Sequence, residues 1–477
     1  MPDRHTTNPW VVLVLICVAQ FMVILDATIV NVALPSIQKD LGLSEANLQW
    51  IISSYTLFFG GFLLLGGRAG DLLGRKRVFL VGLVIFTVAS LLNGLSSSAG
   101  MLIGFRALQG LGAALISPAA LSIISTTFAE GRERARALGV WAAIAIGGSA
   151  VGLVLGGFLT QTFSWPWIFF VNVPVGIITF VLSLRLIPES RDERAERNFD
   201  VAGAVTVTAG LMLLVYAIVN TQQKGWTSVW TIGTAVVAFA LLIAFVVIER
   251  GATAPLVRLD VFHTRTLTTA NVVMLLVASG LFAMFYFNSL YIQRVLGYGP
   301  LEAGLAFLPF TAGIMISAGL SSKYAARAGV RTLTIVGLLI TIAGMLLLAR
   351  IPVDGIYLVD VFPPIMLTSL GMGAVFVSLT MIATMGLEDS DQGLASGLFN
   401  TSQQICGALG LAILATIAAG RTDAAGGESA EALVHGFRWA FAGSAVFLAA
   451  GLVAFVALLR RRHVARIEAE AATAPSF

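Results

Sequence analysis

Runs of about 20 apolar residues recur along the entire chain, and they constrain its fold more than any other feature. A run of that length crosses the hydrocarbon core of a bilayer as an α-helix. Because lipid offers no hydrogen bonds to the backbone, only helices and closed barrels can span it, and these runs are too long and too uniformly apolar for barrel strands. Only 11% of the residues are charged, against about 25% in a soluble domain. The sequence therefore predicts an all-α polytopic membrane protein.

The apolar runs predict fourteen membrane-spanning helices. If the N-terminus lies in the cytoplasm, most of the 29 Lys and Arg residues fall on the cytoplasmic side of these spans. The positive-inside rule then places both termini in the cytoplasm. The net charge of +4 reflects this topology and contact with anionic lipid rather than binding of nucleic acid. The predicted spans are 10–34, 48–66, 78–95, 101–124, 137–161, 166–187, 201–220, 229–248, 268–293, 302–320, 332–350, 357–380, 396–419 and 438–459.

Two polar connections divide the spans into groups: "PESRDERAERNFD" follows the sixth span and "ERGATAPLVRLDVFHTRT" precedes the ninth. They predict an N-terminal six-helix bundle over 1–190, an inserted two-helix linker over 191–260, and a C-terminal six-helix bundle with a cytoplasmic tail over 261–477. "GRKRVFLVGL" from Gly74 and "GVRTLTIVGL" from Gly329 form a faint internal repeat. Duplicated transporter halves produce such repeats; chance agreement in a chain rich in Gly, Val and Leu is the alternative.

A carboxylate, Asp26, stands inside the first apolar run, in "LDATIVNVALP". A charge near the centre of such a helix costs about 2.5–3.5 kcal/mol on insertion scales, so it must face protein or water. A residue that pins helix packing is one alternative. We favour a proton- or cation-binding group, because removal from water favours the neutral form of a carboxyl group. Thr28 and Asn31 follow it and are candidates for the mouth of a substrate cavity.

Arg106 stands inside the fourth span, in "LIGFRALQGLGAA". A rise of about 1.5 Å per residue puts it and Asp26 in the outer halves of their spans, at depths where the guanidinium can reach the carboxylate. A purely structural ion pair is one interpretation, and a pair whose strength changes with protonation is the sharper one. Gln109, three residues further on, shares the face of Arg106 and can extend the network.

The segment "GRAGDLLGRKR", between the second and third spans, is a candidate for a cytoplasmic gate. Gly67 and Gly74 allow close approach and a tight turn. Asp71 can cap a helix end or pair with Arg75 and Lys76. A charged inside loop is ordinary topology by itself, but this spacing of glycine, acid and base favours a specific role.

Gly148, Gly152 and Gly156 recur every four residues in the fifth span, with Gly157 beside the last. They form one flat helix face for close helix–helix contact. Packing is the expected task of this face, and through it two helices could seal or slide.

Aromatic residues gather in "SGLFAMFYFNSLYIQ" of the ninth span, where Phe282 and Tyr286 are helical neighbours. A stripe that faces lipid or packs is one interpretation, and an aromatic wall for a lipophilic substrate is the other. The candidate substrate cavity consists of five residues: Asn31 of the first span, Tyr55 of the second, Gln109 of the fourth, and Phe282 and Tyr286 of the ninth. Tryptophans near the predicted outer interface are expected to anchor in the aromatic belt: Trp165, Trp167, Trp226 and Trp230.

Catalysis finds little support in the sequence. The 4 histidines fall in predicted loops or tails, and none stands beside a carboxylate at metal-ligand spacing. The 2 cysteines, Cys17 and Cys406, fall inside separate spans, which argues against a disulfide framework or a metal site. No glycine-rich phosphate loop with a following Lys-Ser/Thr occurs, so ATP drive is not expected. We expect no enzyme activity, no cofactor and no metal.

Taken together, these motifs resemble those of the fourteen-helix drug:proton antiporter branch of the major facilitator superfamily, over essentially the whole chain. "LDATIVNVALP" is similar to the first-helix signature of the branch, "GRAGDLLGRKR" to the superfamily's loop motif, and "LIGFRALQGLGAA" to its fourth-helix motif. "WPWIFFVNVPVG" resembles another mark of the branch, and "GSAVGLVLGG" resembles its fifth-helix antiporter motif. The resemblance implies the major facilitator fold, antiport, and a part for Arg106 in proton coupling.

Three positions depart from the family pattern. Leu72 replaces a usual basic residue in the loop motif, and Pro166 replaces a usual Arg. Leu153 stands where the antiporter motif carries Pro, so the kink that this Pro would give is not implied here. The glycine face of the motif is complete.

We therefore expect a proton-coupled antiporter that exports lipophilic drugs or antibiotics across the cytoplasmic membrane by alternating access. A proton on Asp26 would loosen its tie to Arg106. The expected partners are the lipophilic substrate, protons and membrane lipid, but no nucleic acid, and the chain is expected to function as a monomer. The alternatives are a proton-coupled symporter that imports a small nutrient on the same fold, a membrane-embedded lipid-modifying enzyme, and a non-transporting sensor or receptor.

Overall fold

The computed structural model of the protein describes residues 8–128, 132–190, 200–252, 255–257, 259–385, 389–427 and 429–459. Residues 1–7 and the predicted cytoplasmic tail (460–477) lie outside these ranges.

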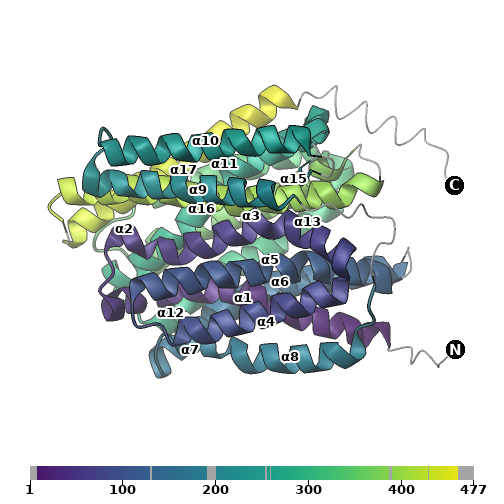
Figure 1. The fold of residues 1–477 in the computed structure, drawn as a ribbon. Coiled ribbons are helices and arrows are strands. Elements are labelled where there is room, and N and C mark those ends of the chain that lie inside the picture. The colour runs from purple at the N-terminus through teal and green to yellow at the C-terminus, as the bar shows by residue number, and fades with distance from the viewer. Residues whose placement is uncertain are drawn as a thin grey trace, which may run out of the picture. The chain divides into compact units, whose positions relative to one another are not determined.

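The described residues form fourteen long helices joined by turns and short helical segments (Figure 1). The first ten elements are α1 (Pro9–Leu41), α2 (Glu45–Leu48), α3 (Trp50–Leu73), α4 (Arg75–Gly94), α5 (Ala99–Thr127), α6 (Arg132–Thr162), α7 (Trp167–Phe170), α8 (Asn172–Leu186), α9 (Val201–Lys224) and α10 (Val229–Gly251). The others are η1 (Leu259–His263), α11 (Arg265–Leu290), η2 (Tyr291–Val295), α12 (Pro300–Ala306), α13 (Leu308–Ala328), α14 (Val330–Leu348), η3 (Tyr357–Val361), α15 (Phe362–Thr384), α16 (Asp389–Ala424) and α17 (Ala430–Leu458).

Every predicted span lies mostly on one of the long helices, so the prediction of an all-α, multi-pass membrane protein is confirmed. Thirteen helical segments of the described residues are long and apolar enough to cross a membrane, and α6 contains the remaining predicted span, 137–161. The helices extend beyond the predicted spans, as in α16, whose 36 residues include 396–419. Apolar sequence marks the part of a helix that lipid or protein covers, whereas backbone hydrogen bonds continue into the polar ends.

The ends of α1 show how the sequence sets its limits. Asn8 is the N-cap, and its side chain accepts a hydrogen bond from the Trp10 N–H at 3.0 Å, with Pro9 in the first turn. The helix ends at Gly42, whose φ of 60° is left-handed and favours glycine. These caps delimit 33 residues, or about 50 Å of helix, which is more than the hydrocarbon core requires.

The chain divides into two compact units. Unit 1 comprises Met1–Leu213, Val237–Leu256 and Gly299–Leu305, and unit 2 comprises Leu214–Val236, Val257–Tyr298 and Ala306–Phe477. The division falls within α9 and within α10, so a separate linker over 191–260 stays a prediction.

Each unit packs its own helices in the same pattern. In unit 1, α1 packs on α6 and α8, α5 packs on α3 and α4, and α4 runs beside α8 (Figure 1). In unit 2, α11 packs on α16 and α17, α15 packs on α13 and α14, and α14 packs on α17. Corresponding helices thus have corresponding neighbours, as two copies of one ancestral half would.

The two glycine-containing repeats occupy corresponding places in this pattern. Gly74 precedes α4 with φ 108°, and Gly329 precedes α14 with φ 76°, both of which favour glycine. Eight residues later, a Cβ at Gly82 would lie 3.0 Å from the Gly112 carbonyl oxygen of α5, and one at Gly337 would lie 2.8 Å from the Gly371 carbonyl oxygen of α15. The repeat therefore marks a tight helix pair in each unit.

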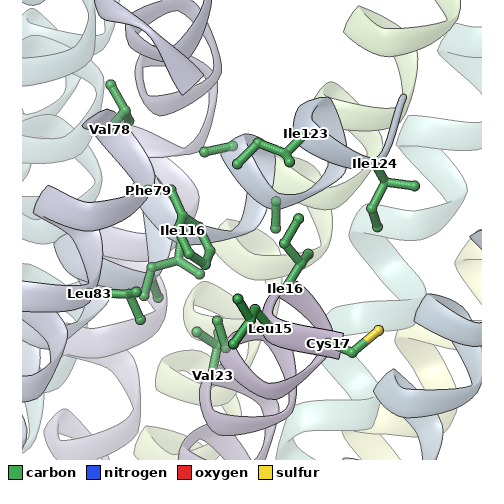
Figure 2. Packing of buried hydrophobic residues seen from close by; sticks show 14 of the residues in the cluster. Leu15, Ile16, Cys17, Val23, Val78, Phe79, Leu83, Ile116, Ile123 and Ile124 are labelled. Carbon is green, nitrogen blue, oxygen red and sulfur yellow. The ribbon is translucent and has the colours of Figure 1, made fainter. Parts of the chain in front are cut away.

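Apolar side chains of α1, α4 and α5 form the core of unit 1, close to the functional site described below. Figure 2 shows them converging from the three helices. Among those labelled there are Leu15, Ile16, Val23, Phe79, Leu83, Ile116 and Ile123. Close packing of this kind holds helices together within a membrane, where burial from water supplies no driving force between them.

One of the four predicted belt tryptophans is placed differently. Trp167, Trp226 and Trp230 are exposed, as a belt position requires. Trp165 is 5% exposed, and its Nε1–H donates to Asp40 Oδ2 at 2.7 Å. The prediction of a belt anchor is wrong for Trp165, because a carboxylate at the end of α1 satisfies its indole inside the protein.

Candidate functional site

Asp26 lies inside α1 and is completely buried. Its Oδ2 accepts a hydrogen bond of 2.5 Å from Arg106 Nη1 of α5, and Arg106 is 1% exposed. A single unpaired charge buried at this place would be energetically unfavourable, and each of the two charges compensates the other. The two charges that stand out in the sequence therefore form one buried ion pair.

The other carboxylate oxygen is also fully engaged. Asp26 Oδ1 accepts from Gln109 Nε2 at 2.7 Å and from Asn172 Nδ2 at 3.0 Å. Gln109 is buried in α5, one turn after Arg106, and Asn172 is the first residue of α8. Three charge-assisted hydrogen bonds thus replace the water that the Asp26 carboxylate would otherwise need.

Two buried residues of α4 join this group to its surroundings. Ser90 Oγ accepts from Asn172 Nδ2 at 3.0 Å and from Gln109 Nε2 at 3.2 Å, and its hydroxyl donates to the Phe169 carbonyl at 3.0 Å. Asn93 Nδ2 donates to Gln109 Oε1 at 2.8 Å. The result is one hydrogen-bonded network across α1, α4, α5, α7 and α8, all within unit 1.

Arg106 is held on its remaining sides as well. Its Nε–H donates to the Ile51 carbonyl of α3 at 3.1 Å, and its Nη1 also donates to Gln109 Oε1 at 2.8 Å. The Tyr55 ring faces the guanidinium, with 4.2 Å from Cζ to the ring centre. These contacts fix Arg106 in place and satisfy a charge that has no access to water.

Sequence reasoning missed Ser90, Asn93 and Asn172. The available signal was weak: Ser90 and Asn93 are three residues apart on α4, and Asn172 lies within "WPWIFFVNVPVG". Neutral polar residues do not stand out in a membrane helix as charges do. Packing of α8 against α1, and of α4 against α5 and α8, brings these residues into the Asp26 network, and apolar patterns alone do not specify such packing.

The five candidates for the substrate cavity fall in different surroundings. Tyr55 and Gln109 are buried in the Asp26 network. The Asn31 side chain is half-buried and donates to the Ala27 and Thr28 carbonyls, each at 3.3 Å. In unit 2, Phe282 packs against Gly407 of α16, and Tyr286 is 1% exposed with its ring on Phe287. Contact of any of them with substrate stays a prediction.

The candidate gate segment bridges α3 and α4. Arg75 binds Asp71 Oδ1 with its Nη2 at 2.9 Å and its Nε at 3.3 Å. Gly74 makes the turn between the helices, and Gly67 lies next to Pro118 of α5. Lys76 points elsewhere, since its Nζ donates to the Leu184 carbonyl at the end of α8 at 2.8 Å.

A residue that was not predicted, Glu189, closes this segment onto the chain after α8. Glu189 Oε1 accepts from the Lys76 backbone N–H at 3.1 Å, at the start of α4. The Arg75 backbone N–H donates to the Ser190 carbonyl at 2.9 Å. A carboxylate at a helix N-terminus accepts hydrogen bonds from free N–H groups and is attracted to the positive end of the helix dipole. The segment is thus anchored within unit 1.

The glycines of α6 lie against α1. A Cβ at Gly148 would be 3.3 Å from the Phe21 ring, and one at Gly156 would lie 2.8 Å from the Ile29 carbonyl oxygen. At Gly152 a Cβ would overlap the Thr28 hydroxyl. Gly157 points away from this row, towards Pro300 at the start of α12. α6 is helical through Leu153, where the antiporter motif of the family has Pro.

The site is a buried carboxylate held by fixed hydrogen-bond donors. Among the described residues, no three His, Cys, Asp or Glu side chains gather in a way that could hold a metal ion. The buried carboxylate, its arginine and the surrounding amides can take up a proton or change hydrogen-bond partners.

Comparison with known sequences identifies the family. Residues 16–411 match the Major Facilitator Superfamily. The chain is 38% identical to the puromycin resistance protein of Streptomyces alboniger, over 98% of this chain and 95% of that relative. It is 40% identical to the cephamycin export protein of Amycolatopsis lactamdurans, over 93% and 91%. It is 34% identical to the tetracenomycin C resistance and export protein of Streptomyces glaucescens, over 87% and 77%.

Solved structures agree on the fold. A bacterial homologue of the human lysosomal transporter Spinster matches with a TM-score of 0.66 and 18% identity, over 98% of this chain and 99% of that one. A peptide transporter of the POT family matches with a TM-score of 0.69 and 16% identity, over 94% and 97%. At these identities the likeness concerns the fold alone, and it confirms the predicted major facilitator architecture. By sequence and by fold, the chain belongs to the major facilitator superfamily.

Proposed function

We propose that the protein is a proton-coupled antiporter that exports lipophilic, drug-like molecules across the cytoplasmic membrane. The observation that carries the proposal is the fully buried Asp26, paired with Arg106 inside a membrane protein. An intramembrane carboxylate is costly and typical of proton pathways. The substrate class is supported by relatives named for puromycin resistance, cephamycin export and tetracenomycin C resistance and export.

In this mechanism a proton from outside neutralises Asp26 and removes half of its ion pair with Arg106. The weakened network lets the protein return to the state that receives substrate from the cytoplasm or the inner leaflet. Release of the proton to the cytoplasm restores the pair, and the two states alternate around one substrate site. Coupling follows because the proton binds one state better than the other.

The other predicted features have places in the same scheme. Both termini lie in the cytoplasm, as the basic residues suggest, and the segment around Asp71 and Arg75 latches the cytoplasmic gate. The glycine face of α6 lets it pack tightly on α1, the helix that carries Asp26. The chain acts as a monomer surrounded by lipid, without enzyme activity.

Everted membrane vesicles test the proposal against import. With an acidic interior, an antiporter accumulates puromycin inside the vesicles while protons leave, and Asp26→Asn abolishes this accumulation. A proton symporter would instead move its substrate out together with protons. Accumulation by Asp26→Asn at the wild-type level would show that coupling does not run through Asp26.

A further inference from the structure

Asp26 is the acceptor in all three of its side-chain hydrogen bonds, so none of its partners is ready to accept a proton-bearing O–H. The carboxylate accepts from Arg106 Nη1, Gln109 Nε2 and Asn172 Nδ2, and each of these atoms can only donate. A protonated carboxyl group has an O–H that must itself be donated. A buried donor without an acceptor is unfavourable. Protonation of Asp26 therefore requires one of its three partners to present an acceptor.

Arg106 and Gln109 are poorly suited to this change. A guanidinium has no acceptor atom, and Arg106 is fixed by the Ile51 carbonyl and the Tyr55 ring. Gln109 has an acceptor, but its Oε1 already receives hydrogen bonds from Arg106 and from Asn93, both at 2.8 Å. Turning the Gln109 amide would place an N–H group against Arg106 Nη1, which cannot accept a hydrogen bond. Both residues are locked in their present orientation.

Asn172 is free of that constraint. Its Nδ2 donates to Asp26 and to Ser90, whereas no hydrogen bond within the described part of the chain ends on its Oδ1. Half a turn about Cβ–Cγ exchanges the two atoms and brings Oδ1 to the Asp26 carboxyl. Ser90 can follow, because a hydroxyl both accepts and donates.

We propose that Asn172 is a positioning residue that reverses its side-chain amide when Asp26 takes up a proton. The proposal rests on the proposed function, in which Asp26 is the proton acceptor. With Asp26 charged, Asn172 donates to it, and Ser90 donates to the Phe169 carbonyl. With Asp26 neutral, its O–H and the Ser90 hydroxyl both donate to Asn172 Oδ1, and the Ser90–Phe169 hydrogen bond breaks.

The reversal of the amide would link proton uptake by Asp26 to a contact between α4 and α7. The Ser90–Phe169 hydrogen bond joins α4 to α7, and it is 3.0 Å long in the present state. The Phe169 carbonyl still accepts from the Val171 N–H afterwards, so it keeps a hydrogen-bond donor. Uptake of one proton in α1 would thereby remove this hydrogen bond between α4 and the short helix that precedes α8.

No second titrating group near Asp26 needs to be invoked. Among the residues that the structure describes, the charged or titratable side chains that face it are Arg106 of α5 and Tyr55 of α3. The contacts from α4 and α8 come from Ser90 and Asn172, and α6 meets α1 here through glycines. The same group of residues therefore contains both the proton site and the amide that responds to it.

Infrared difference spectroscopy of the full-length protein in lipid nanodiscs tests this inference. Spectra at acid and alkaline pH are compared for protein whose asparagine side chains carry ¹³C at the amide carbon. The wild type should show a new band of a protonated carboxyl group and a shift of the labelled amide band. Asp26→Asn should lose both signals, and Asn172→Leu should lose the amide shift but keep the carboxyl band.

Controls separate reversal of the Asn172 amide from protonation of Asp26. Asn288→Leu makes the same replacement in unit 2, at a fully buried amide with no hydrogen-bond partner among the described residues, and should keep both signals. Asn172→Ser guards against misfolding of the leucine variant: it too should keep the carboxyl band and lose the amide shift. A carboxyl band without an Asn172-dependent amide shift overturns the amide reversal alone. Absence of any carboxyl band that depends on Asp26 overturns the proposed function, and the inference with it.

Discussion

The guanidinium carbon of Arg106 lies 4.2 Å from the centre of the Tyr55 ring, and the Tyr55 hydroxyl donates to the Val23 carbonyl of α1 at 3.4 Å. The ring face therefore supports the buried cation, and the hydroxyl ties α3 to α1. A desolvated cation–π contact contributes about 2 kcal/mol, and a neutral hydrogen bond contributes about 1 kcal/mol. The ring is expected to matter more than the hydroxyl.

Replacing Tyr55 separates these two contributions. Tyr55→Phe should keep the proposed proton-driven accumulation of puromycin within about fivefold of the wild type, because it loses only a bond of about 1 kcal/mol. Tyr55→Leu should lower it by roughly tenfold or more, since about 2 kcal/mol of support for Arg106 disappears. Initial rates in everted vesicles, normalised to protein in the membrane, provide the measurement. Equal losses in both variants would assign the effect to the hydroxyl instead.

The ion pair predicts an unusual order of stabilities. Arg106→Leu leaves the Asp26 carboxylate buried without its cation and should cost about 3–5 kcal/mol. The double variant Asp26→Leu/Arg106→Leu leaves no charge and should be more stable than Arg106→Leu, although it carries one more substitution. Thermal unfolding in detergent at alkaline pH, where the lone carboxylate is least easily neutralised, measures the difference. A double variant less stable than Arg106→Leu would contradict this account.

The sequence revealed site residues where a side chain is energetically unfavourable in its expected surroundings. Asp26 and Arg106 stood out because charges are rare within apolar spans, and helical rise alone placed them at similar depth. The glycine row of α6 stood out by its spacing of four. Fold class and span number followed from hydropathy, because a bilayer leaves few possible structures.

What the sequence did not reveal depends on packing between distant segments. Asn172 is 146 residues from Asp26, and Glu189 is 113 residues from Lys76. Both are common polar residues, and the sequence around them does not show which distant segment they pack against. Trp165 was misplaced for the same reason, since its partner Asp40 lies 125 residues away.

Gly147 and Gly152 of α6, which are five residues apart, give a matched test of helix packing. A Cβ at Gly152 would overlap the Thr28 hydroxyl and approach the Leu25 carbonyl oxygen to 2.9 Å, whereas nothing lies within 4 Å of a Cβ at Gly147. Gly152→Ala should therefore destabilise the fold by about 1–3 kcal/mol through overpacking against α1. Gly147→Ala should be neutral or stabilising by up to about 1 kcal/mol, because alanine is the better helix former.

The glycine pair is compared by thermal unfolding of both variants in the same detergent. A lower transition temperature for Gly152→Ala alone supports close contact of α6 with α1. If Gly147→Ala were destabilised to the same extent, the loss would come from the helix itself and not from its interface.

The start of α4 offers a last comparison, between a capping carboxylate and a surface ion pair. Glu189 accepts from the Lys76 N–H at 3.1 Å, while its other oxygen lies 3.7 Å from Arg77 Nε, on a side chain that is 77% exposed. A carboxylate at a helix N-terminus contributes about 0.3–1 kcal/mol, and an exposed pair of this length contributes close to nothing. Glu189→Gln should therefore speed hydrogen exchange of the first turn of α4 about two- to fivefold, and Arg77→Ala should leave it unchanged. Mass spectrometry of the peptide that contains Lys76 measures both, and equal acceleration in the two variants would mean that the ion pair, rather than the cap, holds this turn.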